Sequence, residues 1–142
     1  MIGHTDWSIS EQHNIKLVQN DTTSKITPVP YDFDYTGVID APYAAPDPTL
    51  PIKNVRSRLF RGFCRPPGGY EQVIKVFNQK KKDMYDVYRN FDLLDPKRNE
   101  SILKYFDKFY EILNDPKKVK SQINKACSLP HKHLYDLMPA NP

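Results

Sequence analysis

The pattern of apolar and polar positions changes character near the middle of this 142-residue chain. In the first half, residues 14–18 alternate apolar and polar side chains with β-branched members, which predicts a short strand. A polar turn at 19–24 separates it from a second extended run at 25–33. Pro28 and Pro30 cannot donate to a ladder, so the second run should be an edge strand or one paired on alternate sides. Together the two runs predict a β-hairpin.

The second half of the chain predicts helices. Apolar residues recur with helical spacing from 73 to 88 and from 102 to 113, and the lysines at 80–82 fall on the open face. Asp95-Pro96 and Asp115-Pro116 each place a capping residue before a first-turn proline, which is typical of helix starts. We therefore expect about three helices whose tyrosines and phenylalanines form the core. The tail after Leu129 should be irregular, because it holds three prolines.

Between these halves, residues 35–69 are punctuated by proline and glycine and show no clear period. A loop of that length in a compact domain is usually functional or disordered. The fold class that follows is α+β and mostly helical. Residues 1–69 would carry the hairpin and long loop, and residues 70–142 the helices, as two parts of one structural domain.

Composition narrows the function classes. The net charge of +4 favours acidic or phosphorylated partners, but no aromatic-basic motif predicts nucleic-acid binding. Apolar runs are only a few residues long, so we expect no membrane span. No signal-peptide pattern is visible, and the compartment stays open. Cys64 and Cys127 lie far apart, outside any CxxC pattern. We expect two free thiols in or near the core, with one disulfide as the alternative in an exported protein.

The residues with the clearest chemical potential flank the predicted hairpin. Asp6 precedes it, Asn14 opens it, and Asp32 and Asp34 close it. Phosphoryl transfer needs one carboxylate to orient or deprotonate the attacking hydroxyl, and oxygen ligands to hold Mg²⁺ against the phosphates. The hairpin should bring Asn14 and Asp32 back together and fix their spacing relative to Asp6.

These motifs resemble the C-terminal part of spore-coat-protein-H-like (CotH-type) atypical kinases and, more distantly, of HipA-type kinases, both bacterial. Such kinases carry a Gly-Asn-x-Asp-type catalytic segment, an Asn before a short strand, and a Pro-x-Asp-x-Asp segment after the next strand. The corresponding segments here are 3–6, 14–17 and 30–34.

The resemblance implies a kinase-like C-lobe that works with Mg²⁺ and ATP on a protein hydroxyl. Asp6 would be the catalytic base, Asn14 and Asp32 metal ligands, and Asp34 a second-shell or second-metal residue. Residues 35–63 would correspond to the activation and substrate-binding segment, and the helices to the rest of the lobe.

The chain departs from the kinase pattern at three points. Asn14 lies eight residues after Asp6 rather than about five, and Trp7-Ser8 replaces the usual Arg-His, although His13 could orient Asp6 instead. Only five residues precede Asp6, so no N-lobe with its phosphate-binding lysine is present in this sequence. We therefore expect a fragment, with weak nucleotide binding and incomplete catalysis by itself.

Other interpretations stay open. Asp and Asn favour loop starts and helix caps, so the acidic residues could be ordinary turn residues in a non-catalytic helical interaction module or a pseudokinase-like fragment. The two histidines near the N-terminus lack a third ligand at zinc spacing. A set of arginines could bind a phosphorylated or acidic protein substrate, or could form structural ion pairs: Arg56, Arg58, Arg61 and Arg65.

Overall fold

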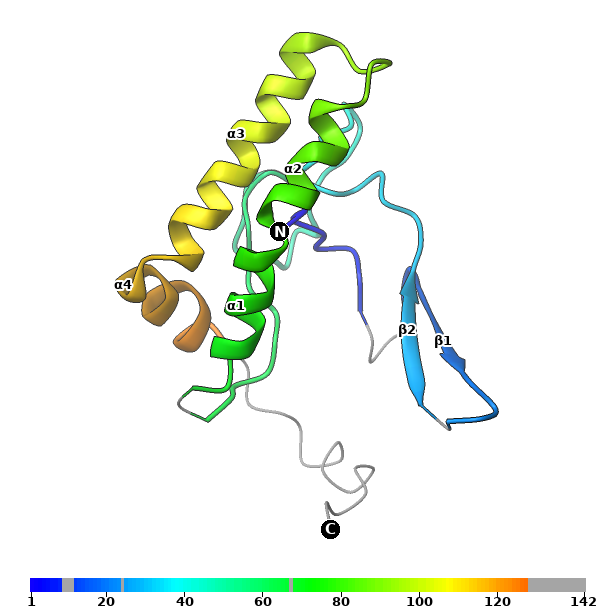
Figure 1. Ribbon diagram of the computed structural model, residues 1–142, viewed down its shortest axis with the longest axis vertical. Coiled ribbons are helices and arrows are strands. Elements are labelled where there is room, and N and C mark those ends of the chain that lie inside the picture. The colour runs from blue at the N-terminus through cyan, green and yellow to red at the C-terminus, as the bar shows by residue number, and fades with distance from the viewer. Residues whose placement is uncertain (9–11, 24, 67, 128–142) are drawn as a thin grey trace. The chain divides into compact units, whose positions relative to one another are not determined.

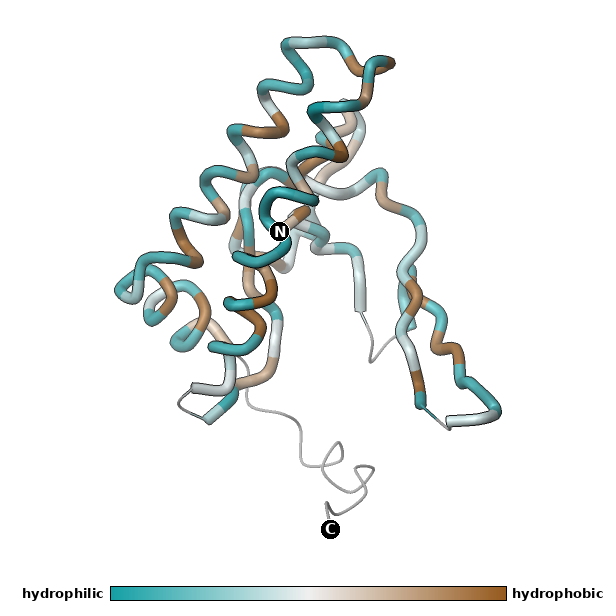
Figure 2. The backbone as a smooth tube through the Cα atoms, in the orientation of Figure 1, coloured by the Kyte–Doolittle hydropathy of each residue, from teal (hydrophilic) through white to brown (hydrophobic). Residues whose placement is uncertain are grey.

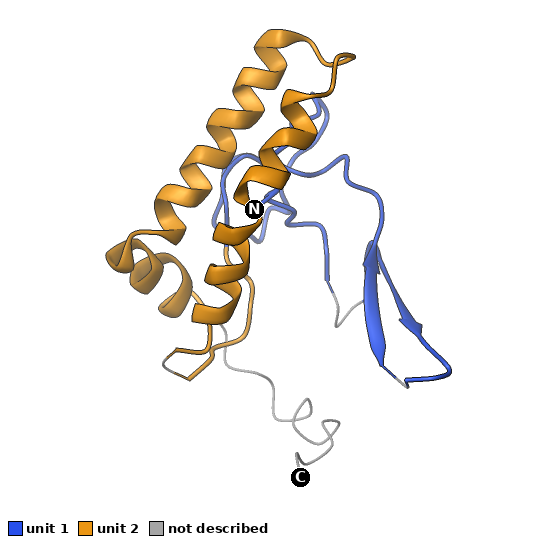
Figure 3. Cartoon of the chain, in the orientation of Figure 1, with its two compact units in different colours: residues 1–59 blue, residues 60–142 orange. Residues whose placement is uncertain are grey.

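A computed structural model describes residues 1–8, 12–23, 25–66 and 68–127 (Figure 1). The chain divides into two compact units, Met1–Leu59 and Phe60–Pro142 (Figure 3). Within the described ranges the first unit holds one antiparallel hairpin and the second holds four α-helices, so the predicted α+β class is confirmed. The predicted irregular tail after Leu129 lies outside the described residues.

The predicted hairpin is present, with β1 at Ile15–Gln19 and β2 at Ile26–Pro30. Ile15 pairs with Pro30 at its open end. The neighbouring pair is hydrogen-bonded, because the Tyr31 amide donates to the Asn14 carbonyl at 3.0 Å. Hydrogen-bonded and non-hydrogen-bonded pairs alternate along an antiparallel ladder. Pro28 and Pro30 therefore occupy non-hydrogen-bonded positions, where a missing N–H costs the ladder nothing.

The described residues between β2 and the first helix form no strand or helix, which confirms the long loop. Part of this loop is nevertheless well packed. Thr36 is fully buried, and its hydroxyl donates to the Phe33 carbonyl at 2.7 Å. Val38, Val55 and Ile15 are buried as well, so the first unit has a small core built mainly from loop residues.

The helices are α1 (Glu71–Gln79), α2 (Lys81–Arg89), α3 (Pro96–Leu113) and α4 (Pro116–Val119), and a π-helical turn, η1 (Lys120–Asn124), follows. Both predicted caps are confirmed. The Asp95 carboxylate accepts from the Arg98 amide at 3.0 Å, and Asp115 accepts from the Lys117 amide at 2.8 Å. Each cap satisfies an amide that the first helical turn leaves without a partner.

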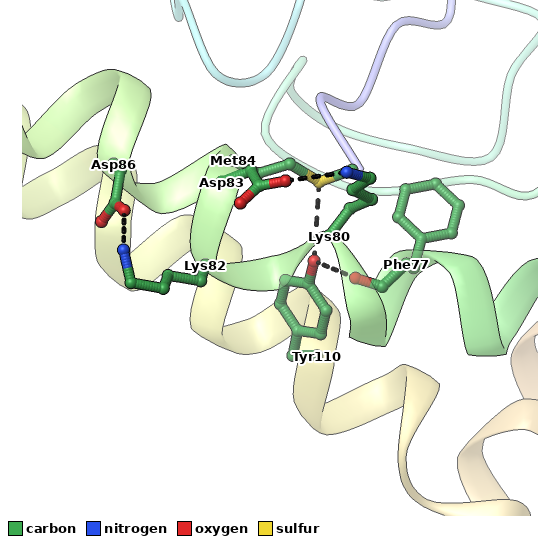
Figure 4. Close-up of polar contacts among 7 residues, drawn as sticks. All are labelled: Phe77, Lys80, Lys82, Asp83, Met84, Asp86 and Tyr110. Carbon is green, nitrogen blue, oxygen red and sulfur yellow. Dashed lines mark hydrogen bonds and ion pairs between the residues drawn. The ribbon is translucent and has the colours of Figure 1, made fainter.

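The expectation of about three helices is wrong at Lys80, where the apolar pattern from 73 to 88 is split between α1 and α2. In a continuous helix the Phe77 carbonyl would accept from the amide of residue 81. Here it accepts instead from the Tyr110 hydroxyl at 2.9 Å, and Tyr110 also contacts the Met84 sulfur (Figure 4). A partner from α3 thus satisfies the carbonyl that the break frees.

The core of the second unit is aromatic and comes mainly from α3, along which hydrophobic and hydrophilic positions recur in Figure 2. Phe106 is fully buried, and the rings of Tyr85 and Tyr88 lie 5.8 Å and 5.1 Å from its ring. Val73 and Val87 fit the helical period but are 52% and 67% exposed, so they lie outside the core. The other buried members on α3 are Ile102, Tyr105, Tyr110 and Leu113.

The expectation of two free thiols is also wrong, and the alternative of one disulfide is confirmed. Cys64 and Cys127 form a disulfide within the second unit rather than two free thiols. The two cysteines are 63 residues apart in sequence, so spacing alone does not predict their pairing. The folded helices between them bring the two cysteines together. A search of the described helices for one long and apolar enough to cross a membrane finds none.

Candidate functional site

Backbone pairing sets the position of the first candidate segment. The Gly37 amide donates to the Gly3 carbonyl at 2.9 Å, and His4 forms an isolated bridge with Thr36. This pairing lays the segment that leads into Asp6 against the segment that follows the acidic pair. Residues separated by about thirty positions in sequence therefore meet at one place in the first unit.

Asp6 is held by the two residues that open the hairpin. The Asn14 amide nitrogen donates to the Asp6 carboxylate at 2.9 Å and to its carbonyl at 3.1 Å. Nδ1 of His13 lies 3.0 Å from the same carbonyl and 3.4 Å from the carboxylate. The predicted orienting role of His13 therefore has a geometric basis. With the amide nitrogen of Asn14 committed to Asp6, its Oδ1 is the side-chain atom suited to a cation.

His4 connects the Asp6 segment to Asp32. Its Nε2 lies 2.9 Å from the Asp32 carbonyl, and its ring packs 5.9 Å from that of Phe33. Asp32 has a φ of 56° and Asn14 a φ of 53°, both in the left-handed region. Asn and Asp tolerate this region better than other non-glycine residues. The two expected metal ligands thus sit on sharply turned backbone at the open end of the hairpin.

The acidic pair at the end of the hairpin is electrostatically strained. The pKa of Asp32 is raised, first by a hydrogen bond shared with the Asp34 carboxyl and then by the negative charge of Asp34. The charge of Asp6 acts in the same direction. Tyr43 donates its hydroxyl to Asp34 at 3.1 Å, and this contact raises the Tyr43 pKa. The three carboxylates therefore lie within electrostatic reach of one another.

The structure pairs Asp6 with Asn14 by a hydrogen bond and places the Asp34 carboxyl beside Asp32, while Asp6 acts on Asp32 only through its charge. No three His, Cys, Asp or Glu side chains in the described ranges are arranged to hold a metal ion by themselves. Mg²⁺ usually takes only one or two protein carboxylates and fills its other positions with water and phosphate oxygens. Like-charged carboxylates whose repulsion raises a pKa are a donor set that a divalent cation would relieve.

The four candidate arginines are divided between the two units. Arg56 pairs with Asp40 at 3.4 Å, and the Nε of Arg58 donates to the Met1 carbonyl at 3.2 Å. Arg61 and Arg65 are exposed and belong to the second unit. Structural pairing therefore accounts for Arg56 and Arg58, and the substrate-binding role predicted for the set stays a prediction.

Sequence reasoning missed two residues of the site. His4 was considered only as a metal ligand, whereas it contacts the Asp32 backbone. Its signal was present in the spacing, because His4 and Asp6 match the first and third positions of the H-x-D segment in kinase catalytic loops. Tyr43 gave no signal, because nothing in a loop tyrosine nine residues from Asp34 predicts contact with it.

Among the described residues of the second unit, a shallow groove of about 420 Å³ is lined from α1, α2 and α3. Its cations are largely satisfied by neighbours. Lys82 pairs with Asp86, and the Lys81 ammonium lies 4.7 Å from the centre of the Tyr110 ring. Tyr85 donates its hydroxyl to Asp107 at 2.7 Å. These contacts describe a stabilised helix surface, so the candidate site remains in the first unit.

Comparisons of this chain with protein-family models, with curated proteins and with solved structures give no match. The resemblance to CotH-type and HipA-type kinases therefore stays a prediction that rests on the motifs. The functional argument has to come from the contacts around Asp6 and Asp32.

Proposed function

We propose that the first unit is the catalytic-loop and metal-binding part of a kinase-like phosphotransferase. The complete protein would transfer the γ-phosphoryl group of ATP to a hydroxyl group on a protein. One observation carries the proposal. The Asn14 amide bonds to the Asp6 carboxylate at 2.9 Å, while His4 ties the same segment to the Asp32 carbonyl at 2.9 Å. A possible base and two possible metal ligands are thus linked by direct contacts.

In this proposal Asp6 positions the acceptor hydroxyl and takes its proton. The amide of Asn14 and the ring of His13 hold the Asp6 carboxylate in one orientation, which reduces the reorganisation needed during the reaction. Both contacts come from residues at the open end of the hairpin, so the hairpin orients the base.

Asn14 Oδ1 and the Asp32 carboxylate would hold Mg²⁺, with Asp34 beside them. When bound, Mg²⁺ neutralises charge on the phosphates of the nucleotide. The hydrogen bond with Asp34 and the negative charges of Asp34 and Asp6 raise the pKa of Asp32, and a divalent cation would relieve the same repulsion. The order of Asp6, Asn14 and the Asp32-Phe33 pair also follows the order of catalytic Asp, Asn and Asp-Phe-Gly in protein kinases.

The proposal is tested by Mg²⁺-dependent ATP binding to the full chain, measured by calorimetry. We expect weak binding that requires Mg²⁺ and is lost in Asp32→Asn. The matched control is Asp21→Asn, because Asp21 is an exposed residue in the hairpin turn. Unchanged Mg²⁺-dependent affinity in Asp32→Asn would refute the assignment.

A second candidate function is a helical interaction module, favoured by one observation. Val73 and Val76 on α1 are 52% and 49% exposed, three residues apart on one helix face. In that case a partner protein would bind equally well to the wild type and to variants of Asp6, Asn14 and Asp32. Loss of partner binding on Val73→Asp with full binding by Asp32→Asn would favour this candidate.

A further inference from the structure

The disulfide joins the two ends of the described helical region. Cys64 lies before α1, and Cys127 follows the π-helical turn η1, so the bond encloses all four helices. Both cysteines belong to the second unit. This bond is independent of the acidic site and of the function proposed for it.

The ends that the disulfide joins have little burial of their own. None of the described residues of α1, α4 or η1 is buried. The buried residues of the second unit lie instead on α2 and α3, at Tyr85 and along the α3 stripe ending at Leu113. Helices without a buried face gain little from tertiary packing, which is the main source of helix stability in proteins.

Non-covalent contacts at these ends are few. Tyr70 donates its hydroxyl to the Phe63 carbonyl at 2.7 Å and packs edge-on against Phe60. Asn78 and Asn114 exchange side-chain hydrogen bonds at 2.8 Å and 3.1 Å across an exposed surface. Such hydrogen bonds contribute about 1 kcal/mol each at most positions. The described contacts thus leave the disulfide as the main connection between the segment before α1 and the segment after α4.

We propose that the Cys64–Cys127 disulfide is a redox-dependent lock for the helical unit. In its oxidised form it holds the start of α1 and the α4–η1 segment against the α2–α3 core. In its reduced form these two ends detach, while the Phe77 end of α1 stays packed on α3 and α2 and α3 stay paired. Disulfides persist in oxidising compartments, so the locked state belongs to an exported or periplasm-like environment.

The lock forms by thiol–disulfide exchange with an oxidised dithiol protein or glutathione disulfide. One cysteine thiolate attacks the disulfide of the oxidant and forms a mixed disulfide. The second thiolate then displaces the oxidant's remaining sulfur. The two cysteines together lose two protons and two electrons, and the oxidant leaves as two thiols.

The test uses the full chain in oxidised and reduced forms, with hydrogen exchange read by mass spectrometry. We expect reduction to raise exchange severalfold in residues 68–76 and 116–127, with residues 96–113 unchanged. The melting temperature should fall by about 10 °C or more on reduction. The double variant Cys64→Ser/Cys127→Ser should match the reduced protein and should not respond to reductant.

Two results would overturn the inference. The first is alkylation of both cysteines without prior reduction, in protein prepared under oxidising conditions. The second is a blocked pair whose reduction leaves exchange and melting temperature unchanged. Ala126→Ser is the matched control, because it introduces serine at the exposed neighbour of Cys127 and should behave as the wild type. If the double variant fails to fold, the reduction experiment on the wild type still decides.

Discussion

Different physical interactions stabilise the first unit and the second unit of this protein. The first unit has a small core, and polar contacts fix its backbone, among them those of His4 and Asn14. The second unit is a set of helices around a fully buried Phe106, capped by Asp95 and Asp115. Polar contacts therefore contribute much of the order in the first unit, whereas the order of the second unit comes mainly from buried aromatic side chains.

Backbone conformation shows the same contrast. Among the described residues, every non-glycine residue with positive φ lies in the first unit: Gln12, Asn14, Asp32 and Asp40. Such conformations cost free energy, and they persist where surrounding contacts fix them. Two of the four are the expected metal ligands. The chain therefore tolerates unfavourable backbone at its candidate site and nowhere in its described helices.

The largest loss of stability is expected from a substitution in the aromatic core of the second unit. Phe106→Ala should cost about 3–5 kcal/mol of unfolding free energy, because it leaves a cavity where a fully buried ring stood. Denaturant unfolding followed by the helical circular-dichroism signal measures the loss. Val87→Ala is the control, and its 67% exposed side chain should change stability by less than about 0.5 kcal/mol. A small effect of Phe106→Ala would contradict an aromatic core.

Two substitutions of Asn14 in the first unit separate the effect of backbone strain from that of the side-chain hydrogen bond. Asn14→Ala should destabilise the first unit by about 2 kcal/mol. It removes a charge-assisted hydrogen bond to Asp6 and puts alanine at a φ of 53°. Asn14→Gly loses the same hydrogen bond but adopts this φ freely, so it should be less harmful. Hydrogen exchange of the Tyr31 amide, which donates to residue 14, reports both variants. Equal effects would mean that backbone strain plays no part.

A smaller loss of stability is expected at the N-terminal cap of α3. Asp95→Ala should cost about 1 kcal/mol, because its carboxylate satisfies the Arg98 amide in the first turn of α3. Asp95→Asn retains a side-chain oxygen acceptor and should recover most of this loss. Thermal unfolding of the three proteins measures it. A full loss in the asparagine variant would contradict capping as the cause.

The smallest effect is a change in titration. The pKa of Asp32 lies above its ordinary value because of Asp34, so this carboxyl binds a proton more tightly in the folded state than in the unfolded chain. The contribution of Asp32 to stability therefore falls as pH rises from the unfolded pKa through the folded pKa. Asp34→Asn should lower the pKa of Asp32 and flatten this dependence. Carboxyl-carbon NMR titration measures both, and an unmoved pKa would contradict the interaction.

Much of the fold could be predicted from the sequence. The alternation at 14–18 predicted β1 to within one residue, and Asp95 and Asp115 cap helices as predicted. These signals are local, so they do not depend on contacts with distant parts of the chain. The break at Lys80 could not be predicted, because the Tyr110 hydroxyl that satisfies the freed Phe77 carbonyl comes from another helix. The sequence could offer the disulfide only as an alternative, since spacing alone cannot pair two distant cysteines.

The candidate site was predictable in its members but not in its connections. Asp6, Asn14, Asp32 and Asp34 stand out as polar residues around a hairpin. The contact of His4 with the Asp32 carbonyl depends on the pairing of residues 2–4 with 36–38, which no period in the sequence indicates. Long-range backbone pairing is therefore the part of the site that sequence patterns did not contain.

We propose that Asp6, Asn14 and Asp32 of the first unit bind one cation. Paramagnetic broadening by Mn²⁺, a stand-in for Mg²⁺, tests it directly in the NMR spectrum of the full chain. We expect Mn²⁺ to broaden the resonances of Asp6, Asn14 and Asp32 selectively. Excess Mg²⁺ should reverse this broadening, and Asp32→Asn should abolish it. Broadening spread over all exposed carboxylates, or unchanged in Asp32→Asn, would contradict it.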